Sequence, residues 1–224
     1  MYLSRAEINP ERRGARKLLA SPQAMHAAIL RSFSGLGTRP SGDQSSDGRV
    51  LWRIDRDANA VLLYLASPVE PDLTHIIEQA GRPATQTWIT RSYTGLLDSI
   101  AEGQRWAFRL TANPVRSGRR GNDPETRRYG HVTVRQQRQW LIDRSERAGF
   151  RIPIGVQKEP QLVVKDRQVR RFSRDGRMVT LAIATFDGLL EVTNPHALRS
   201  AMCRGIGSGK AYGCGLLTLA RLEI

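Results

Sequence analysis

The chain closes with the stretch Gly205-Ile206-Gly207-Ser208-Gly209-Lys210-Ala211-Tyr212-Gly213-Cys214-Gly215-Leu216-Leu217, between a predicted helix and a predicted last strand. A glycine-rich backbone can approach a phosphate group closely and can point several N–H groups at it. Alanine follows Gly209-Lys210 where a P-loop needs Ser or Thr to hold magnesium, and a Rossmann motif places its glycines after a strand. The stretch predicts a phosphate-binding turn with Gly207, Gly209 and Lys210 as contacts and no nucleotide cofactor; a purely structural turn is the alternative.

The elements before this stretch repeat one pattern twice. In the second half, the predicted strands and helices are strand 104–115, helix 134–148, strands 161–173 and 177–185, helix 194–204 and strand 215–222. In the first half they are strand 2–8, helix 21–33, strands 50–54 and 60–66, helix 73–80 and strand 85–93. Both halves follow the order β-α-β-β-α-β. This order predicts an α+β protein of two tandem ferredoxin-like (βαββαβ) domains, residues 1–100 and 101–224.

The charge of the chain indicates a polyanionic partner. Lys and Arg together number 35 against 21 Asp and Glu, and only four of the 35 are lysine. Arginine is suited to forked contacts with phosphate and to stacking on bases. Residues 105–177 carry a net charge of +12, whereas residues 41–104 carry −4. Nucleic acid is favoured over a membrane surface because no long amphipathic basic helix is predicted.

Several classes of site and location are disfavoured by the sequence. No apolar run approaches the ~18 residues that a transmembrane helix needs, and the N-terminus lacks the apolar core of a signal peptide. The two cysteines, Cys203 and Cys214, are typical of reduced thiols in a cytoplasmic protein. The four histidines and two cysteines nowhere reach the spacing of metal ligands, so no metal site is predicted.

Three segments carry a family resemblance: Met1-Tyr2-Leu3-Ser4, Leu19-Ala20-Ser21-Pro22-Gln23-Ala24-Met25-His26, and the terminal glycine-rich stretch. Together they resemble the CasE-type CRISPR RNA endoribonucleases of type I-E systems, from the first strand to the last. The resemblance implies two tandem ferredoxin-like domains and metal-independent cleavage at the base of a CRISPR repeat hairpin. It also implies that the protein stays on its product within the Cascade complex, beside other Cascade subunits.

His26 is the candidate catalytic residue. Cleavage by the adjacent 2′-hydroxyl needs a group that takes a proton, a group that gives one, and cations or N–H donors for the phosphorane oxygens. Histidine suits proton transfer because its unperturbed pKa is near 6.5. Position on a helix favours catalysis only weakly, and the resemblance is what makes His26 the prime candidate. Its expected role is general acid to the departing 5′-oxygen, although the sequence leaves acid and base roles open.

Gln23 departs from the family pattern. Family members often place a tyrosine three residues before the histidine, on the same helical face. Glutamine can hydrogen-bond to the ribose or the phosphate, but it cannot accept a proton in the same way. Gln23 is therefore predicted as a second site residue whose role differs from that of tyrosine. Arg31, Ser34 and Tyr212 are candidate substitutes, and Arg31 is also predicted to contact RNA.

Arginines cluster around the predicted hairpin turn Asp175-Gly176. Five of them predict a ribbon that contacts an RNA duplex through backbone phosphates, with a solvated hairpin as the alternative: Arg167, Arg170, Arg171, Arg174 and Arg177. A second cluster within 116–129 predicts a flexible phosphate-contacting loop. The remaining histidines carry no specific signal, and His75 and His196 are expected at the surface.

Two other functions remain open from the sequence. The first is a non-catalytic subunit that caps an RNA hairpin, which Gln23 favours. The second is a general RNA-binding protein outside CRISPR systems, which accounts for the charge but not for the terminal stretch together with the His26 segment.

Overall fold

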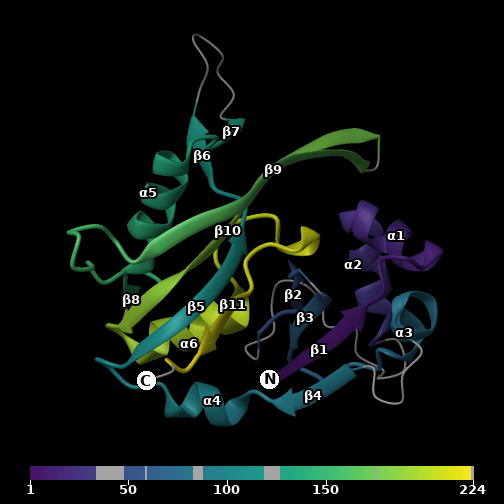
Figure 1. Ribbon diagram of the computed structural model, residues 1–224, viewed down its shortest axis with the longest axis horizontal. Coiled ribbons are helices and arrows are strands. Elements are labelled where there is room, and N and C mark those ends of the chain that lie inside the picture. Colours follow the sequence, from purple (N-terminus) through teal and green to yellow (C-terminus); the bar gives the residue numbers. More distant parts are fainter. Residues whose placement is uncertain (34–47, 59, 83–87, 119–126, 175, 223–224) are drawn as a thin grey trace. The chain divides into compact units, whose positions relative to one another are not determined.

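The computed structural model describes residues 1–33, 48–58, 60–82, 88–118, 127–174 and 176–222. The chain forms two compact units (Figure 1). The first unit contains Met1–Ser99 together with Cys203–Gly205 and Lys210–Leu216. The second contains Ile100–Met202, Ile206–Gly209 and the chain from Leu217 onward. The terminal glycine-rich stretch therefore contributes to both units, although the predicted domain boundary placed it entirely in the second half.

The first unit is a four-stranded antiparallel sheet with helices. Its elements are β1 (Tyr2–Ile8), α1 (Arg13–Ala20), α2 (Pro22–Arg31), β2 (Leu51–Arg56), β3 (Val61–Ser67), α3 (Thr74–Ala80), β4 (Trp88–Ser92), α4 (Thr94–Ser99) and the 3₁₀-helix η1 (Lys210–Tyr212). The strand order is β2-β3-β1-β4, and every neighbouring pair is antiparallel. Helices connect β1 to β2 and β3 to β4, as predicted.

One face of this sheet is covered by helices. Figure 1 shows α1, α2 and α3 on the same side of the sheet, and their apolar side chains form one core with the strands. The alternation of side chains along a strand sends every second residue into this core. Ala6 and Ile8 of β1 and Leu63 and Leu65 of β3 are buried in this way, against Met25, Ala28 and Ile29 of α2.

The second unit is built on a larger antiparallel sheet. Its elements are β5 (Arg105–Ala112), β6 (Val115–Gly118), β7 (Arg127–Gly130), α5 (Val134–Ser145), β8 (Phe150–Arg151), β9 (Leu162–Arg174), β10 (Arg177–Val192), α6 (Pro195–Arg204) and β11 (Leu217–Ala220). The order is β11-β5-β10-β8, and β9 also pairs with β10. Because β5 pairs only with 184–191 of β10, the end of the β9–β10 hairpin extends past β5 as a two-stranded ribbon (Figure 1).

The core of the second unit lies on one face of that sheet. Trp106, Phe108 and Leu110 of β5 alternate into it and are buried. Helix α5 packs on this face through Trp140, whose ring stacks on Phe186 of β10 with 6.0 Å between centroids. A capping box formed by Thr133 and Gln136 begins α5. The opposite face carries the polar residues of β5 and β10.

The structure differs from the predicted elements in several places: β8 and η1 were not predicted, and β10 runs seven residues past the predicted strand 177–185. Part of the predicted loop 116–129 forms the hairpin β6–β7. Helix α1 was not predicted because its N-cap, Arg12, makes no side-chain cap hydrogen bond and only Ala15 and Leu18 are buried. Helix α4 has six residues and a single buried side chain, Leu97, which is too short a pattern to indicate a helix.

Candidate functional site

Helix α2 presents the predicted catalytic residues. The side chain of Ser21 accepts the amide of Ala24 and caps the helix, and Pro22 occupies its first turn. His26 follows the buried Met25 and is itself half-buried, with its Nδ1 atom shielded from solvent. Gln23 lies one turn earlier and is exposed, and Arg31 is exposed at the C-terminal end. Ser34 lies outside the described residues.

The terminal glycine-rich stretch brings a second element to α2. The 3₁₀-helix η1, which contains Lys210 and Tyr212, packs beside α2 and β2 within the first unit. Both side chains are half-buried. Lys210 and His26 lie at opposite ends of the chain, and no sequence signal indicates that these segments are neighbours. The fold thus places a lysine- and tyrosine-bearing turn next to the helix of His26.

Two tryptophans explain the glycines of this stretch. Gly207 and Gly213 have φ angles of 81° and 82°, a left-handed conformation that favours glycine. A Cβ atom at Gly213 would lie 2.8 Å from the ring of Trp52, and one at Gly207 would lie 3.0 Å from the ring of Trp140. Gly209 also has a positive φ of 78°. Close packing of the backbone on aromatic rings therefore accounts for Gly207 and Gly213 without a ligand.

A buried arginine also holds the terminal stretch. Arg53 of β2 is 2% exposed and forms a two-pronged ion pair with Asp55, at 2.6 and 2.9 Å. Its Nη1 atom donates to the carbonyl of Leu216 at 3.1 Å, and its guanidinium lies 5.3 Å from the ring centre of Tyr64. This role was not predicted, because the sequence does not show that Leu216 packs on Arg53. Without that contact, an arginine in a strand looks like a surface residue.

The β9–β10 ribbon contains a β-bulge that determines which face of the ribbon each basic residue lies on. Lys165 pairs with Thr185, but Gln168 pairs with Ile183, so two residues of β9 oppose the single residue between them on β10. Asp166, the first extra residue, has a positive φ of 49°. Because neighbouring residues of a strand face opposite sides, the bulge puts Arg170 on the face of Lys165 and Arg171 on the other.

The five predicted RNA-contacting arginines are therefore not equivalent. Arg167 binds α5 and its N-terminal flank, donating from Nε to Gln137 at 3.0 Å and from Nη2 to the carbonyl of Val132. Arg170 is half-buried and donates to Gln168, whereas Arg171 is exposed. The backbones of Arg174 and Arg177 pair at the end of the ribbon, and their side chains lie outside the described part of the structure.

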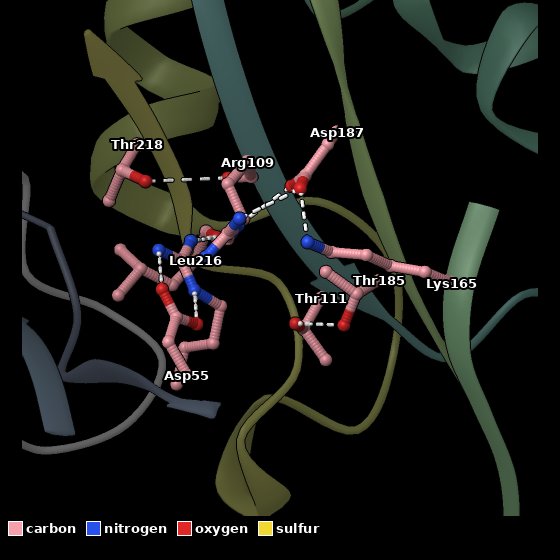
Figure 2. Close-up of polar contacts among 9 residues, drawn as sticks. Asp55, Arg109, Thr111, Lys165, Thr185, Asp187, Leu216 and Thr218 are labelled. Atoms are coloured by element: carbon pink, nitrogen blue, oxygen red, sulfur yellow. Dashed lines mark hydrogen bonds and ion pairs between the residues drawn. The ribbon is translucent and has the colours of Figure 1, made fainter. Parts of the chain in front are cut away.

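The face of the second sheet opposite α5 carries an ion-pair ladder across three strands. Figure 2 shows Asp187 of β10 between Arg109 of β5 and Lys165 of β9, at 2.7 and 2.6 Å. Burial of Asp187 opposes its ionisation, but the hydrogen bonds from Arg109 and Lys165 outweigh this and lower the pKa of its carboxyl group. Thr111 and Thr185 bond to each other beside this ladder. Both cations of the ladder are already engaged by a carboxylate.

The other histidines occupy three different environments. His196 is exposed, as expected. His75 is half-buried, contrary to the predicted surface position, and its Nε2 lies 2.9 Å from the carbonyl oxygen of Ala28 on α2. Burial, with the positive charges of Arg116 and Arg144, lowers the pKa of His131. Only the folded chain brings His75 to α2, so the sequence did not distinguish it from a surface residue.

Metal ligands, membrane spans and disulfides are not found among the residues that the structure describes. No group of three His, Cys, Asp or Glu side chains is arranged to hold a metal ion there. In the same residues, no helix is both long and apolar enough to cross a membrane. Cys203 and Cys214 form no disulfide; the first is half-buried and the second is buried.

Comparison with known proteins decides the family. The family described as CRISPR associated protein matches residues 1–221. The chain belongs to this family. Its relatives include the CRISPR-associated endoribonuclease Cse3 of Thermus thermophilus, which is 29% identical over 98% of this chain and 100% of that protein. The CRISPR system Cascade subunit CasE of Escherichia coli is 30% identical over 74% of this chain and 83% of that protein.

Solved structures of family members agree over nearly the full length. Cse3 bound to 19 nt RNA superposes with a TM-score of 0.77 at 27% identity, covering 98% of both chains. Thermus thermophilus Cse3 bound to an RNA that represents a pre-cleavage complex gives a TM-score of 0.74 at 28% identity, with the same coverage. These matches confirm the resemblance to the Cse3/CasE family that the three sequence segments indicated.

Proposed function

We propose that this family member is an endoribonuclease that cleaves precursor CRISPR RNA at the base of the repeat hairpin. The observation that carries the proposal is the match of TM-score 0.77 to Cse3 bound to RNA, over 98% of both chains. The name of the Thermus relative, an endoribonuclease, supports the same activity. We further propose that the product stays bound within a cytoplasmic Cascade complex with other Cascade subunits, as the name of the Escherichia coli relative suggests.

The proposed architecture is two tandem ferredoxin-like domains, residues 1–100 and 101–224. The strand order β2-β3-β1-β4 with antiparallel neighbours supports this assignment in the first unit, since it is the order of a split βαβ fold. In the second unit, β11-β5-β10 with β8 and β9 on the outer edge of β10 supports the same order. The segment Lys210–Leu216 lies in the C-terminal domain by sequence but belongs to the first compact unit.

The proposed reaction uses the 2′-hydroxyl of the RNA as the nucleophile. The hydroxyl gives its proton to solvent, its oxygen attacks the adjacent phosphorus and the bond to the 5′-oxygen breaks, which leaves a 2′,3′-cyclic phosphate and a 5′-hydroxyl. Tethering of the nucleophile removes the entropic cost of bringing it to the phosphorus, and the proposed mechanism uses no metal ion. His26 gives a proton to the departing oxygen, and Gln23 hydrogen-bonds the ribose or phosphate. Lys210 stabilises the charge on the phosphorane.

RNA affinity in this proposal comes from phosphate contacts spread over many groups. Arg31 follows His26 on α2, and Arg170 and Arg171 lie on the β9–β10 ribbon with Arg174 and Arg177 at its end. Amides of Gly207 and Gly209 add N–H donors to phosphate. Arg167 is expected to contribute less than the other four arginines, because Gln137 and Val132 already engage its guanidinium.

A cleavage assay tests the proposal directly. The protein is incubated with its cognate repeat hairpin RNA in EDTA, and the product ends are identified. We expect cleavage at the base of the hairpin, a 2′,3′-cyclic phosphate and a 5′-hydroxyl on the products, and co-elution of the hairpin product with the protein. Absence of cleavage with and without divalent ions contradicts the enzymatic proposal, and cleavage that needs divalent ions contradicts its metal independence.

Gln23 favours a second candidate function, a non-catalytic subunit that binds the hairpin. Its exposed side chain stands where the family resemblance implies a tyrosine, and an amide cannot accept a proton as a phenolate can. Gln23→Tyr distinguishes the two candidates when single-turnover cleavage is measured. An inert wild type that gains activity with tyrosine supports the binding subunit, whereas an active wild type whose rate stays level or falls supports a site adapted to glutamine.

A further inference from the structure

We propose that His75 is a positioning residue for His26, because it fastens the C-terminal end of α2. The inference rests on the proposed function, in which His26 acts from α2. No sequence signal pointed to His75, which lies 49 residues further along the chain than His26, on α3. The observation that carries the inference is the 2.9 Å contact between its Nε2 atom and the carbonyl oxygen of Ala28.

The end of α2 leaves this carbonyl in need of a donor. In a continuing α-helix, the amide of Ser32 would donate to Ala28. Here the amide of Ser32 donates to Ile29 at 3.0 Å, and that of Phe33 donates to Leu30 at 3.3 Å. The last turn is therefore tightened to i→i+3 bonds. Ala28 is fully buried, so water does not readily replace the missing donor.

His75 supplies the donor from a neighbouring helix. A carbonyl oxygen only accepts hydrogen bonds, so Nε2 carries the proton in this contact. The same segment makes a second bond to α2, since the amide of Asp72 donates to the carbonyl of Ser32 at 3.0 Å. The side chain of Asp72 accepts the amide and hydroxyl of Thr74, which orders the start of α3. Two carbonyls at the end of α2 are thus held by one ordered segment.

This fastening matters because α2 cannot hold its own position. The helix has ten residues, and isolated helices shorter than about 12–15 residues are marginal in water. At its N-terminal end it is capped by Ser21, and at its C-terminal end it is bound by Asp72 and His75. His26 lies between these ends, half a turn before Ala28. The bond from His75 therefore sets how α2 presents His26 beside η1.

Two substitutions separate the hydrogen bond from the volume of the side chain. His75→Leu keeps an apolar body without a donor, and His75→Gln places an amide N–H at the same number of bonds from the backbone. His196→Leu is the matched control, because His196 is exposed on α6. For each protein we would measure the single-turnover cleavage rate, the Kd for uncleaved repeat hairpin, the Tm, and amide hydrogen exchange along α2.

The expected result is a loss of rate without a loss of binding. His75→Leu should cleave about tenfold more slowly, below the ~10²-fold that a 1 Å misplacement can cost. Its Kd should match that of wild type, since RNA affinity comes from phosphate contacts elsewhere. His75→Gln should recover the rate, and His196→Leu should leave it unchanged. Hydrogen exchange at Ser32 and Phe33 should speed up in His75→Leu alone.

The outcomes that overturn the proposal are distinct from failure of the proposed function. If wild type cleaves and His75→Leu cleaves equally fast, His75 does not position His26. If His75→Gln is as slow as His75→Leu, the hydrogen bond is not the cause. If wild type is inert, the proposed function fails, and hydrogen exchange then decides: unchanged protection of α2 in His75→Leu overturns the fastening role, and faster exchange rescued by glutamine supports it.

Discussion

Helix α2 and the β9–β10 ribbon meet RNA, in the proposed function, by opposite means. On α2, one half-buried histidine is held by a capped N-terminus, a buried apolar face and two bonds at the C-terminal end. On the ribbon, several basic residues lie along two strands, and Arg171 with its neighbours Val169 and Met178 is exposed. The first arrangement has one group that nothing replaces, and the second has many groups that share one task.

This contrast predicts which measurement a substitution in each region should change. Phosphate contacts are nearly interchangeable, because each contributes through released counterions rather than through exact geometry. A proton-transfer group must reach a particular atom, so its removal affects the rate and hardly affects affinity. Substitutions in α2 should therefore change the cleavage rate, and substitutions in the ribbon should change RNA affinity. The opposite result in either region would contradict this division.

The largest effect is expected at His26. His26→Ala should slow cleavage by roughly 10²–10⁴-fold, the usual contribution of a positioned proton-transfer group. Hairpin Kd should be nearly unchanged, because one side chain adds little to many phosphate contacts. Single-turnover kinetics and filter binding provide the two measurements. Cleavage at the wild-type rate would mean that α2 is not the active-site helix.

The arginines should show the reverse pattern. Hairpin affinity should fall on the order of 10³-fold between 50 and 200 mM salt if ~6 phosphates are contacted. Arg170→Ala with Arg171→Ala should weaken binding and flatten this salt dependence, with little effect on the cleavage rate of bound RNA. The matched control is Arg56→Ala with Arg91→Ala, two exposed arginines of the first unit. An equal loss of hairpin affinity in both double variants would mean that the ribbon has no specific role in binding.

The single arginine variants test which face of the ribbon binds RNA. Arg170 and Arg171 are sequence neighbours on opposite faces of the ribbon, and Leu181 and Ile183 are buried on the face of Arg170. The more exposed Arg171 should therefore account for most of the loss in affinity. Isothermal titration calorimetry of both single variants measures the two losses in affinity. A larger loss from Arg170→Ala would mean that the face of Arg170, and not that of Arg171, binds the RNA.

A smaller effect is expected in the glycine-rich stretch, and it concerns stability. Gly207 and Gly103 have φ angles of 81° and 78°, but only Gly207 has a neighbour at its Cβ position, the ring of Trp140. Alanine at either position costs about 1–2 kcal/mol for the left-handed backbone. Gly207→Ala should lose more, because Trp140 must also move. Urea unfolding compares the two, and equal losses would show that the contact with Trp140 is unimportant.

The smallest effect is expected at Asp187. Asp187→Asn should lower the free energy of unfolding by about 1 kcal/mol, since Arg109 and Lys165 are each more than a third exposed and solvent screens the pair. The pKa of Asp187 is lowered in the folded state from 3.8, so its stabilisation is present above that pH. It is lost as the pH falls through the lowered pKa. Urea unfolding at several pH values measures the difference in the free energy of unfolding between wild type and Asp187→Asn, which should shrink only in acid. Glu102→Gln is the control, because Glu102 is exposed.

Much of the fold could be predicted from local sequence signals. The cap Ser21-Pro22 and the stripe through Met25 and Ile29 predicted α2, and the structure confirms both. The turn Asp175-Gly176 was predicted between two strands, and Gly176 has a φ of 74°. The hairpin β6–β7 was missed because its strands have four residues each and contain arginine and glycine rather than a run of apolar residues.

The candidate site was predictable only in part. His26 and Gln23 are close in sequence, so their common helix could be predicted. The proximity of η1 to α2, the bond from His75 to Ala28 and the bond from the buried Arg53 to Leu216 join segments that are distant in the chain. No local pattern encodes such pairs, because His75 and Arg53 taken alone resemble ordinary surface residues.

The strong basic charge and the capped helix α2 follow from the sequence alone, because they depend on composition and on local backbone preferences. Only the fold sets which arginines share a face of the ribbon, since one extra residue at Asp166 reverses the alternation of side chains beyond it. It also decided that the terminal stretch returns to α2, because that placement comes from packing between segments about 180 residues apart.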